Sequence, residues 1–150
     1  MQRSITHQKP IVPFLYVVLF ILYSSLSSIY LLLPPLFAVL FVLYSDALRR
    51  EDFLLLMIIS FCLVLYEANK GYVLFSSIIY FTLAYKFIMP KISQNFSCKS
   101  CIKISFVLLA YLGYYIFLAL VAKIFLLPLP EINYYIVYYI VIEFFLVSIL

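Results

Sequence analysis

The chain has 150 residues, of which 68% are hydrophobic and 11% are charged, with a net charge of +4 and a mean hydropathy of +1.20. Soluble domains of this size carry a charge on about a quarter of their residues, so the composition excludes an ordinary soluble protein. We therefore expect an all-α integral membrane protein. The length allows one domain over residues 1–150, with no room for a soluble catalytic module.

The amino-terminal segment has some features of an export signal. Arg3 and Lys9 precede a long apolar run, and no charged residue follows before Asp46. A cleavable signal has an apolar region of only about 7–15 residues, followed by a cleavage site of small residues. The apolar run here is longer and has no Ala-x-Ala-like site. We expect it to remain in the protein as a membrane anchor.

Apolar stretches and their breaks predict the helices. About 20 apolar residues span a bilayer, and the uncharged stretch 10–45 is too long for one span. Pro34-Pro35 divides it, because proline removes a backbone donor and restricts the residue before it. Gly71 and Pro90 mark later breaks, and the polar segment Lys91–Lys103 is the longest predicted loop. The prediction is a single bundle of six transmembrane helices, at about residues 14–33, 35–48, 53–66, 72–89, 104–126 and 132–150.

The basic residues predict the orientation of these helices, since Lys and Arg are enriched in cytoplasmic loops. With the N-terminus inside, eight basic residues are cytoplasmic: Arg3, Lys9, Arg49, Arg50, Lys86, Lys91, Lys99 and Lys103. Only Lys70 and Lys123 lie on the outer side. We therefore predict a multi-pass protein of the bacterial inner membrane with both termini in the cytoplasm.

No motif in the sequence predicts an enzyme, a cofactor or a metal site. The chain lacks a G-x-S-x-G, an H-E-x-x-H and a P-loop, and its only histidine is His7. Cys98 and Cys101 form a C-x-x-C without the βαβ context of a redox motif or the further ligands of a zinc site. We interpret them as two reduced thiols in a cytoplasmic loop.

Glu143 is an ionisable residue inside the last predicted helix. An acidic side chain in lipid is costly unless it is paired or faces the bundle interior. At a rise of about 1.5 Å per residue, Glu143 lies roughly 17 Å from the outer end and Lys86 roughly 21 Å. An interior Glu143–Lys86 ion pair is therefore possible, as is separate snorkelling of each side chain to the headgroups. Tyr135 and Tyr139 share the helix face of Glu143, as phenolic neighbours or as simple aromatic packing.

The segment Leu33–Ile92 resembles the rod shape-determining protein MreD family in the order of its features. They are Leu33-Pro34-Pro35-Leu36, Arg49-Arg50, Leu65-Tyr66-Glu67, Asn69-Lys70-Gly71 and Ala84-Tyr85-Lys86-Phe87. The family usually has glycines in the third helix and an aspartate at its end. This chain has no glycine from Phe53 to Tyr66, and a glutamate at position 67.

The resemblance implies a non-enzymatic membrane scaffold of the bacterial cell-elongation complex. Such a subunit holds an MreC-like periplasmic scaffold protein and links it to cytoskeletal and peptidoglycan-synthesis proteins. Residues of the predicted outer turn, Glu67, Asn69 and Lys70, are then candidates for contacts with the partner.

MreD-like proteins are also similar to the substrate-binding membrane subunits of energy-coupling-factor vitamin transporters, which gives an alternative function. Such a subunit needs a polar pocket on its outer side. The outer turns here are short and hold few polar residues: Glu67, Asn69, Lys70, Glu131 and Asn133. This favours the scaffold, and a small channel or a lipid-handling protein is a third possibility.

Overall fold

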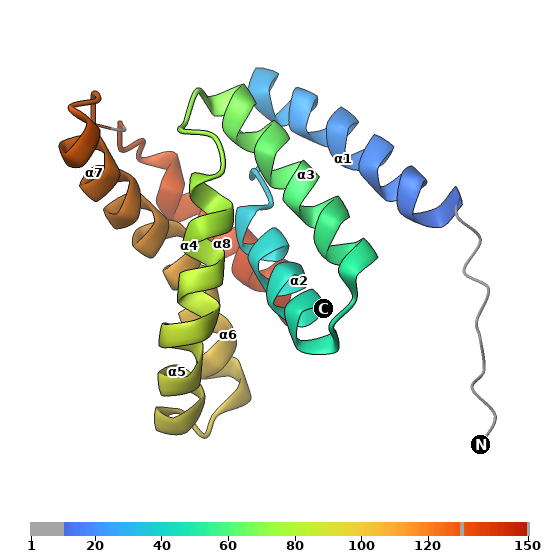
Figure 1. Ribbon diagram of the computed structural model, residues 1–150, viewed down its shortest axis with the longest axis vertical. Helices are drawn as coiled ribbons and strands as arrows, with labels where there is room; N and C mark the ends of the chain where they lie inside the picture. The colour runs from blue at the N-terminus through green and yellow to red at the C-terminus, as the bar shows by residue number, and fades with distance from the viewer. Residues whose placement is uncertain (1–10, 130, 150) are drawn as a thin grey trace.

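The computed structural model describes residues 11–129 and 131–149, and every regular element in these ranges is a helix (Figure 1). The elements form six helical segments, because two of the segments each contain a π-helical stretch between two α-helices. In chain order the elements are α1 (Ile11–Ile29), α2 (Phe37–Arg50), α3 (Phe53–Lys70), α4 (Ser76–Leu83), η1 (Ala84–Ile88), α5 (Met89–Asn95), α6 (Lys99–Leu108), η2 (Leu109–Gly113), α7 (Tyr114–Phe125) and α8 (Tyr135–Ile149). The all-α prediction is confirmed.

The predicted boundaries are wrong around Pro90, where we expected a helix to stop. The segment α4–η1–α5 continues through Pro90 to Asn95. The π-helical stretch η1 lies just before the proline, and the Met89 N–H donates to the carbonyl of Ala84, five residues back. The hydrogen-bond register therefore changes next to Pro90, which has no N–H to donate. The predicted loop Lys91–Lys103 shrinks to residues 96–98 between α5 and α6.

Two helical segments are long and apolar enough to cross a membrane: Phe53–Lys70 and the 27-residue Lys99–Phe125. Apolar helices at Phe14–Ile29 and Tyr135–Ile149 are shorter. Among the described residues, the exposed large apolar side chains outnumber the buried hydrophobic residues. The surface is thus apolar over most of the molecule.

Helix α2 lies at the centre of the core. Its residues Phe37 and Phe41 are almost fully buried, and the Phe37 ring lies 5.1 Å from Tyr66, 5.0 Å from Phe81 and 4.7 Å from Tyr114, measured between ring centroids. These tilted arrangements suit aromatic rings, whose faces are negative and whose edges are positive. The rings join α2 to α3, α4 and α7 in one aromatic core.

The helices run between two ends of the molecule, as Figure 1 shows. The end of α1 and the turn at residues 71–75 lie toward the top of the view, and so does the end of α7. The turns at residues 51–52 and 96–98 lie toward the bottom. We call the first of these the upper end. Helix α2 is the exception, because it begins in the middle of the molecule, below the upper end.

Candidate functional site

Glu143 of α8 is fully buried, with a side chain that is 0% exposed. Its carboxylate accepts hydrogen bonds from the backbone N–H of Phe37 (3.1 Å) and of Ala38 (2.6 Å), the first two residues of α2. The Tyr111 hydroxyl in η2 donates a further hydrogen bond to the same carboxylate. The first N–H groups of a helix have no partner within it, and the helix dipole is positive there. Glu143 therefore caps α2 from another helix.

This cap requires α2 to begin deep in the molecule. Glu143 is the ninth residue of α8, so the start of α2 lies about 12 Å along α8 from its first residue. Residues 30–36 bring the chain inward from the end of α1 to that point. The segment contains Pro34 and Pro35, which have no N–H groups that need an acceptor.

Side chains of neighbouring helices bind the carbonyls of this inward segment. The Tyr23 hydroxyl donates to the Pro34 carbonyl (2.7 Å), and the Ser27 hydroxyl donates to the Leu33 carbonyl (3.0 Å). The Tyr139 hydroxyl donates to the carbonyl of Leu31. Backbone polar groups that are buried away from water need such partners. The inward segment is thus held by α1 and α8 together.

Glu67, in the last turn of α3, is also 0% exposed and caps a second helix. Its carboxylate accepts hydrogen bonds from the backbone N–H of Phe75 (2.6 Å) and of Ser77 (2.5 Å) at the start of α4. The hydroxyls of Ser76 (3.0 Å) and Ser77 (2.6 Å) also donate to it. The Ser76 hydroxyl lies 3.0 Å from the Tyr114 hydroxyl, which extends the network to α7.

The two caps share an unusual backbone geometry. The residue before each capped helix is in the left-handed conformation without being glycine: Leu36 has a φ of 56° and Phe75 a φ of 67°. This conformation costs a residue with a Cβ about 1–2 kcal/mol. In each case a buried carboxylate accepts several hydrogen bonds from the start of the capped helix. These bonds offset the cost of the left-handed residue. All the oxygens of Glu67 and Glu143 accept, so neither side chain offers a free base.

The predicted ion pair between Glu143 and Lys86 is wrong. The Lys86 side chain is exposed, whereas Glu143 is buried against backbone N–H groups and Tyr111. Tyr139, for which the sequence left open a contact with Glu143 or simple aromatic packing, donates to the inward segment. Burial of Glu143 is confirmed. Its partners lie 32 residues or more away in sequence, and no spacing pattern within one helix could indicate them.

The residues predicted to contact a partner at the outer turn divide into two groups. Glu67 is fully buried and therefore cannot form that contact. Asn69 and Lys70 are exposed, and the Asn69 amide donates to the Ser24 hydroxyl at 3.0 Å. These two residues remain candidates for an external contact.

A cavity of about 260 Å³ lies at the upper end of the molecule. Its walls come from α1, α3, η2, α7 and α8, and the Phe37 ring contributes as well. Six tyrosines line it: Tyr66, Tyr72, Tyr111, Tyr114, Tyr115 and Tyr139. Lys70, Glu131 and Asn133 supply its charged and amide groups. We call it the tyrosine cavity. From the sequence, the few polar residues of these short turns argued against a capture site.

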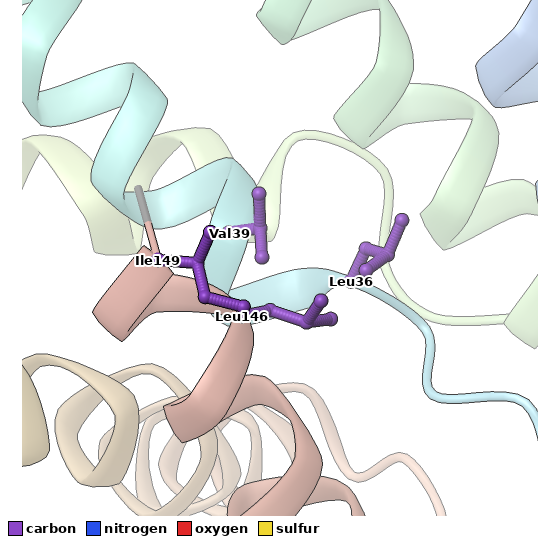
Figure 2. Close-up of a pocket in the computed structure, with 4 residues that line it drawn as sticks. All are labelled: Leu36, Val39, Leu146 and Ile149. Atoms are coloured by element: carbon purple, nitrogen blue, oxygen red, sulfur yellow. The ribbon is translucent and has the colours of Figure 1, made fainter.

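A second, more open groove of about 530 Å³ lies where the start of α2 meets the end of α8. Figure 2 shows the four side chains that line it, Leu36, Val39, Leu146 and Ile149. All four are aliphatic. The groove thus supplies shape and apolar surface, without a group that could orient a polar ligand.

The C-x-x-C cysteines lie at the start of α6 rather than in a long loop. Cys98 is the exposed residue just before α6, and Cys101 lies in the first turn; both thiols are free. The neighbouring backbone N–H and thiol of Cys101, followed by the backbone N–H of Ser100, lower the pKa of Cys98 from its ordinary value of 9.0. Within residues 11–129 and 131–149, no three His, Cys, Asp or Glu side chains group closely enough to hold a metal ion.

No protein-family model, curated protein or solved structure matches this chain.

Proposed function

We propose that the protein is a multi-pass membrane protein that acts without turnover, as a scaffold subunit of the bacterial cell-elongation complex. The observation that carries the proposal is the use of both buried carboxylates, Glu67 and Glu143, as caps for the starts of α4 and α2. The acidic groups that could serve chemistry inside the bundle are thus committed to holding its shape. What remains for function is the surface.

The apolar surface supports a membrane location. Soluble monomers rarely expose apolar patches of more than a few hundred Å², whereas lipid tails cover such surfaces. The six helical segments alternate between two ends, which suits six crossings with both termini on one side. The inward segment 30–36 also fits, because irregular backbone at membrane depth needs cover from the protein and hydrogen-bond partners.

The resemblance to the MreD family supports the cellular role. Its first quoted feature, Leu33-Pro34-Pro35-Leu36, ends at the helix start that Glu143 caps. Another quoted feature contains Glu67, which caps the start of α4. Two of the five features that carry the resemblance therefore lie at the two caps. In this proposal the upper end faces the periplasm and meets the MreC-like partner through Asn69 and Lys70.

Co-expression of the tagged chain with the MreC-like protein of the same genome tests the scaffold function. We expect the two proteins to co-purify in mild detergent, and depletion of the chain to convert rods into round cells. A variant with Asn69→Ala and Lys70→Ala should recover less of the partner. The matched control, Arg49→Ala, is an exposed change at the other end and should leave recovery unchanged. Normal cell shape after depletion, together with failure to co-purify, would contradict the proposal.

The tyrosine cavity favours a second candidate function, a substrate-binding membrane subunit of a transporter. Its position at the upper end, with charged groups at its edge, is what capture from the outer side requires. In that case the chain should co-purify with an ATP-hydrolysing coupling module instead of elongation proteins, and its deletion should abolish uptake of one compound.

A further inference from the structure

We infer that the tyrosine cavity is a binding site for a small zwitterion with a planar ring, such as an aromatic amino acid. The inference depends on the cavity alone and goes beyond the scaffold function. It stands whether the protein's partner belongs to an elongation complex or to a transporter. The argument has three parts: the walls, one hydroxyl group inside, and the charges at the edge.

The walls of the cavity suit a flat, largely apolar body. Six tyrosine rings and Phe37 surround about 260 Å³, slightly below the roughly 300–1,000 Å³ of pockets for drug-sized ligands, so the occupant is a small compound. Aromatic rings bind one another in stacked or edge-to-face arrangements, worth about 0.5–1.5 kcal/mol per pair beyond area burial. Rings fixed by a folded core bind with little loss of side-chain freedom, and Tyr114 and Tyr66 are fixed by their contacts with Phe37.

The Tyr66 hydroxyl gives the cavity a polar group. Tyr66 is only 8% exposed, yet its hydroxyl has no hydrogen-bond partner within the described residues. Every fully covered polar side-chain atom in those residues does have a partner, so the Tyr66 oxygen keeps some free surface. We assign this free surface to the cavity, because Tyr66 is one of its lining residues. A buried hydroxyl without a hydrogen-bond partner favours a ligand whose ring carries its own donor or acceptor.

The edge of the cavity carries one cationic and one anionic side chain. Lys70 ends α3, and Glu131 lies in the turn between α7 and α8, so the two charges come from different elements. They do not form an ion pair with each other. A carboxylate near Lys70 and an ammonium near Glu131 would each gain a charge-assisted hydrogen bond, and the Asn133 amide can serve either.

A simple organic cation fits less well, although tyrosine faces attract cations. Glu143 is a buried acid bonded to Tyr111 of the cavity wall, and its oxygens already accept hydrogen bonds from Phe37, Ala38 and Tyr111. It is therefore not free to balance a cation. Lys70 at the edge would repel one. A ligand with both charges satisfies Lys70 and Glu131 together.

The chain contains no tryptophan and 15 tyrosines, which permits a direct binding assay. The full chain is placed in lipid nanodiscs, and its tyrosines are excited. Energy transfer from these tyrosines to a bound indole ring is measured as indole emission. Four probes share the ring and differ in charge: L-tryptophan, tryptamine, indole-3-acetate and indole. We expect saturable transfer to L-tryptophan, with binding about tenfold or more tighter than that of the other three, since each charge-assisted bond is worth at least that factor. Empty nanodiscs should give no transfer.

Four variants locate the bound probe. Lys70→Met should weaken L-tryptophan and indole-3-acetate binding, and Glu131→Gln should weaken L-tryptophan and tryptamine binding. Tyr66→Phe keeps the ring and the fold but should weaken L-tryptophan binding severalfold, because the hydroxyl is lost. The matched control, Tyr134→Phe, changes a tyrosine that is 97% exposed and does not line the cavity, so binding should be unchanged.

The inference is overturned by the absence of saturable transfer to any probe, or by equal binding of all four probes. Equal binding by the Tyr66→Phe variant and the wild type would also overturn it, by placing the probe elsewhere. The assay needs no partner protein. Failure here would therefore leave the co-purification test of the scaffold function untouched, and the reverse also holds.

Discussion

Glu143 illustrates how one acidic residue can specify a helix start. Its two oxygens receive three donors from two other elements, α2 and η2. A glutamine has one acceptor oxygen and one NH₂ group, so at least one of these donors would face another donor. The carboxylate is therefore required for its geometry, more than for its charge alone.

We predict that Glu143→Gln lowers the free energy of unfolding by about 2–3 kcal/mol, because a charged acceptor is lost and a buried N–H is left unpaired. Thermal unfolding in nanodiscs measures the loss. The matched control is Glu51→Gln, the same change at an exposed glutamate, for which we expect almost no effect. Equal stability of the two variants would show that Glu143 does not cap α2.

The exposed position of Lys86 gives a second prediction at this scale. Because Lys86 and Glu143 do not meet, their substitutions should act independently. Lys86→Met combined with Glu143→Gln should be as unstable as the sum of the single variants. Partial recovery in the double variant would instead restore the ion pair expected from the sequence. Tyr111→Phe is the substitution that should fail to add to Glu143→Gln, since Tyr111 and Glu143 are hydrogen-bonded to each other.

At the scale of single elements, the two glycines of the chain have different structural roles. Gly71 ends α3 with a φ of +68°, a conformation that favours glycine. Gly113 has ordinary helical geometry in η2 and is needed for space, because a Cβ there would lie 1.9 Å from the Tyr80 hydroxyl oxygen. That hydroxyl donates to the carbonyl of Leu109 in the same π-helical stretch (2.7 Å). Tyr80 of α4 thus packs against Gly113 of η2, where a Cβ would leave no room for its hydroxyl.

We predict that Gly113→Ala destabilises the protein by about 1–3 kcal/mol, the usual cost of overpacking. Tyr80→Phe removes the clashing oxygen, and the next atoms lie 3.1 and 3.2 Å from the added Cβ, which small shifts can accommodate. The double variant should therefore be more stable than Gly113→Ala alone, as measured by thermal unfolding. Simple addition of the two losses would mean that the backbone, not the Tyr80 ring, takes up the strain.

The inward segment 30–36 gives another prediction at this scale. Tyr23→Phe removes the donor to the Pro34 carbonyl and should cost about 1 kcal/mol. The effect should be local, with faster hydrogen exchange of the first amides of α2. Tyr16→Phe, an exposed tyrosine of the same helix, is the matched control and should leave that exchange unchanged. Equal exchange in both variants would mean that Tyr23 does not hold the segment.

Local sequence features predicted the elements well and their connections poorly. Apolar length and the breaks at Pro34-Pro35, Arg49-Arg50 and Gly71 predicted six helical segments near their observed positions. Pro90 misled the prediction, because η1 shifts the hydrogen-bond register beside it. The caps of α2 and α4 could not be predicted, for a different reason. Their donors are backbone N–H groups, which every residue except proline carries, so the sequence holds no sign of which ones will meet a buried carboxylate.

At the scale of the whole molecule, the proposed topology makes Cys98 a reporter. It is exposed at the end opposite the tyrosine cavity, which lies in the cytoplasm in the proposed topology. In a variant that keeps Cys98 alone, a membrane-impermeant maleimide should label inside-out vesicles and not right-side-out ones. Tyr134→Cys in a cysteine-free chain is the control and should show the opposite pattern. Labelling of Cys98 from the outside would reverse the topology.

The same variant yields a pH prediction. The thiolate is the reactive form, and the backbone N–H groups at positions 101 and 100, which the variant keeps, lower the pKa of Cys98 from 9.0. The alkylation rate rises with pH up to the pKa and then levels off, so the rate for Cys98 should level off below pH 9.0. The cysteine introduced at position 134 lacks such donors and should level off at higher pH. Identical profiles would mean that α6 does not stabilise the Cys98 thiolate.

The long-range cap of α2 also sets an order of events during synthesis. Glu143 lies 105 residues after Ala38, so at about 5–20 residues per second the start of α2 waits about 5–20 s for its acceptor. Until then, two buried backbone donors and the strained Leu36 lack the group that holds them. The first turn of α2 therefore gains its acceptor only after residue 143 has left the ribosome. In a nascent chain that stalls before position 143, this helix start has no capping carboxylate.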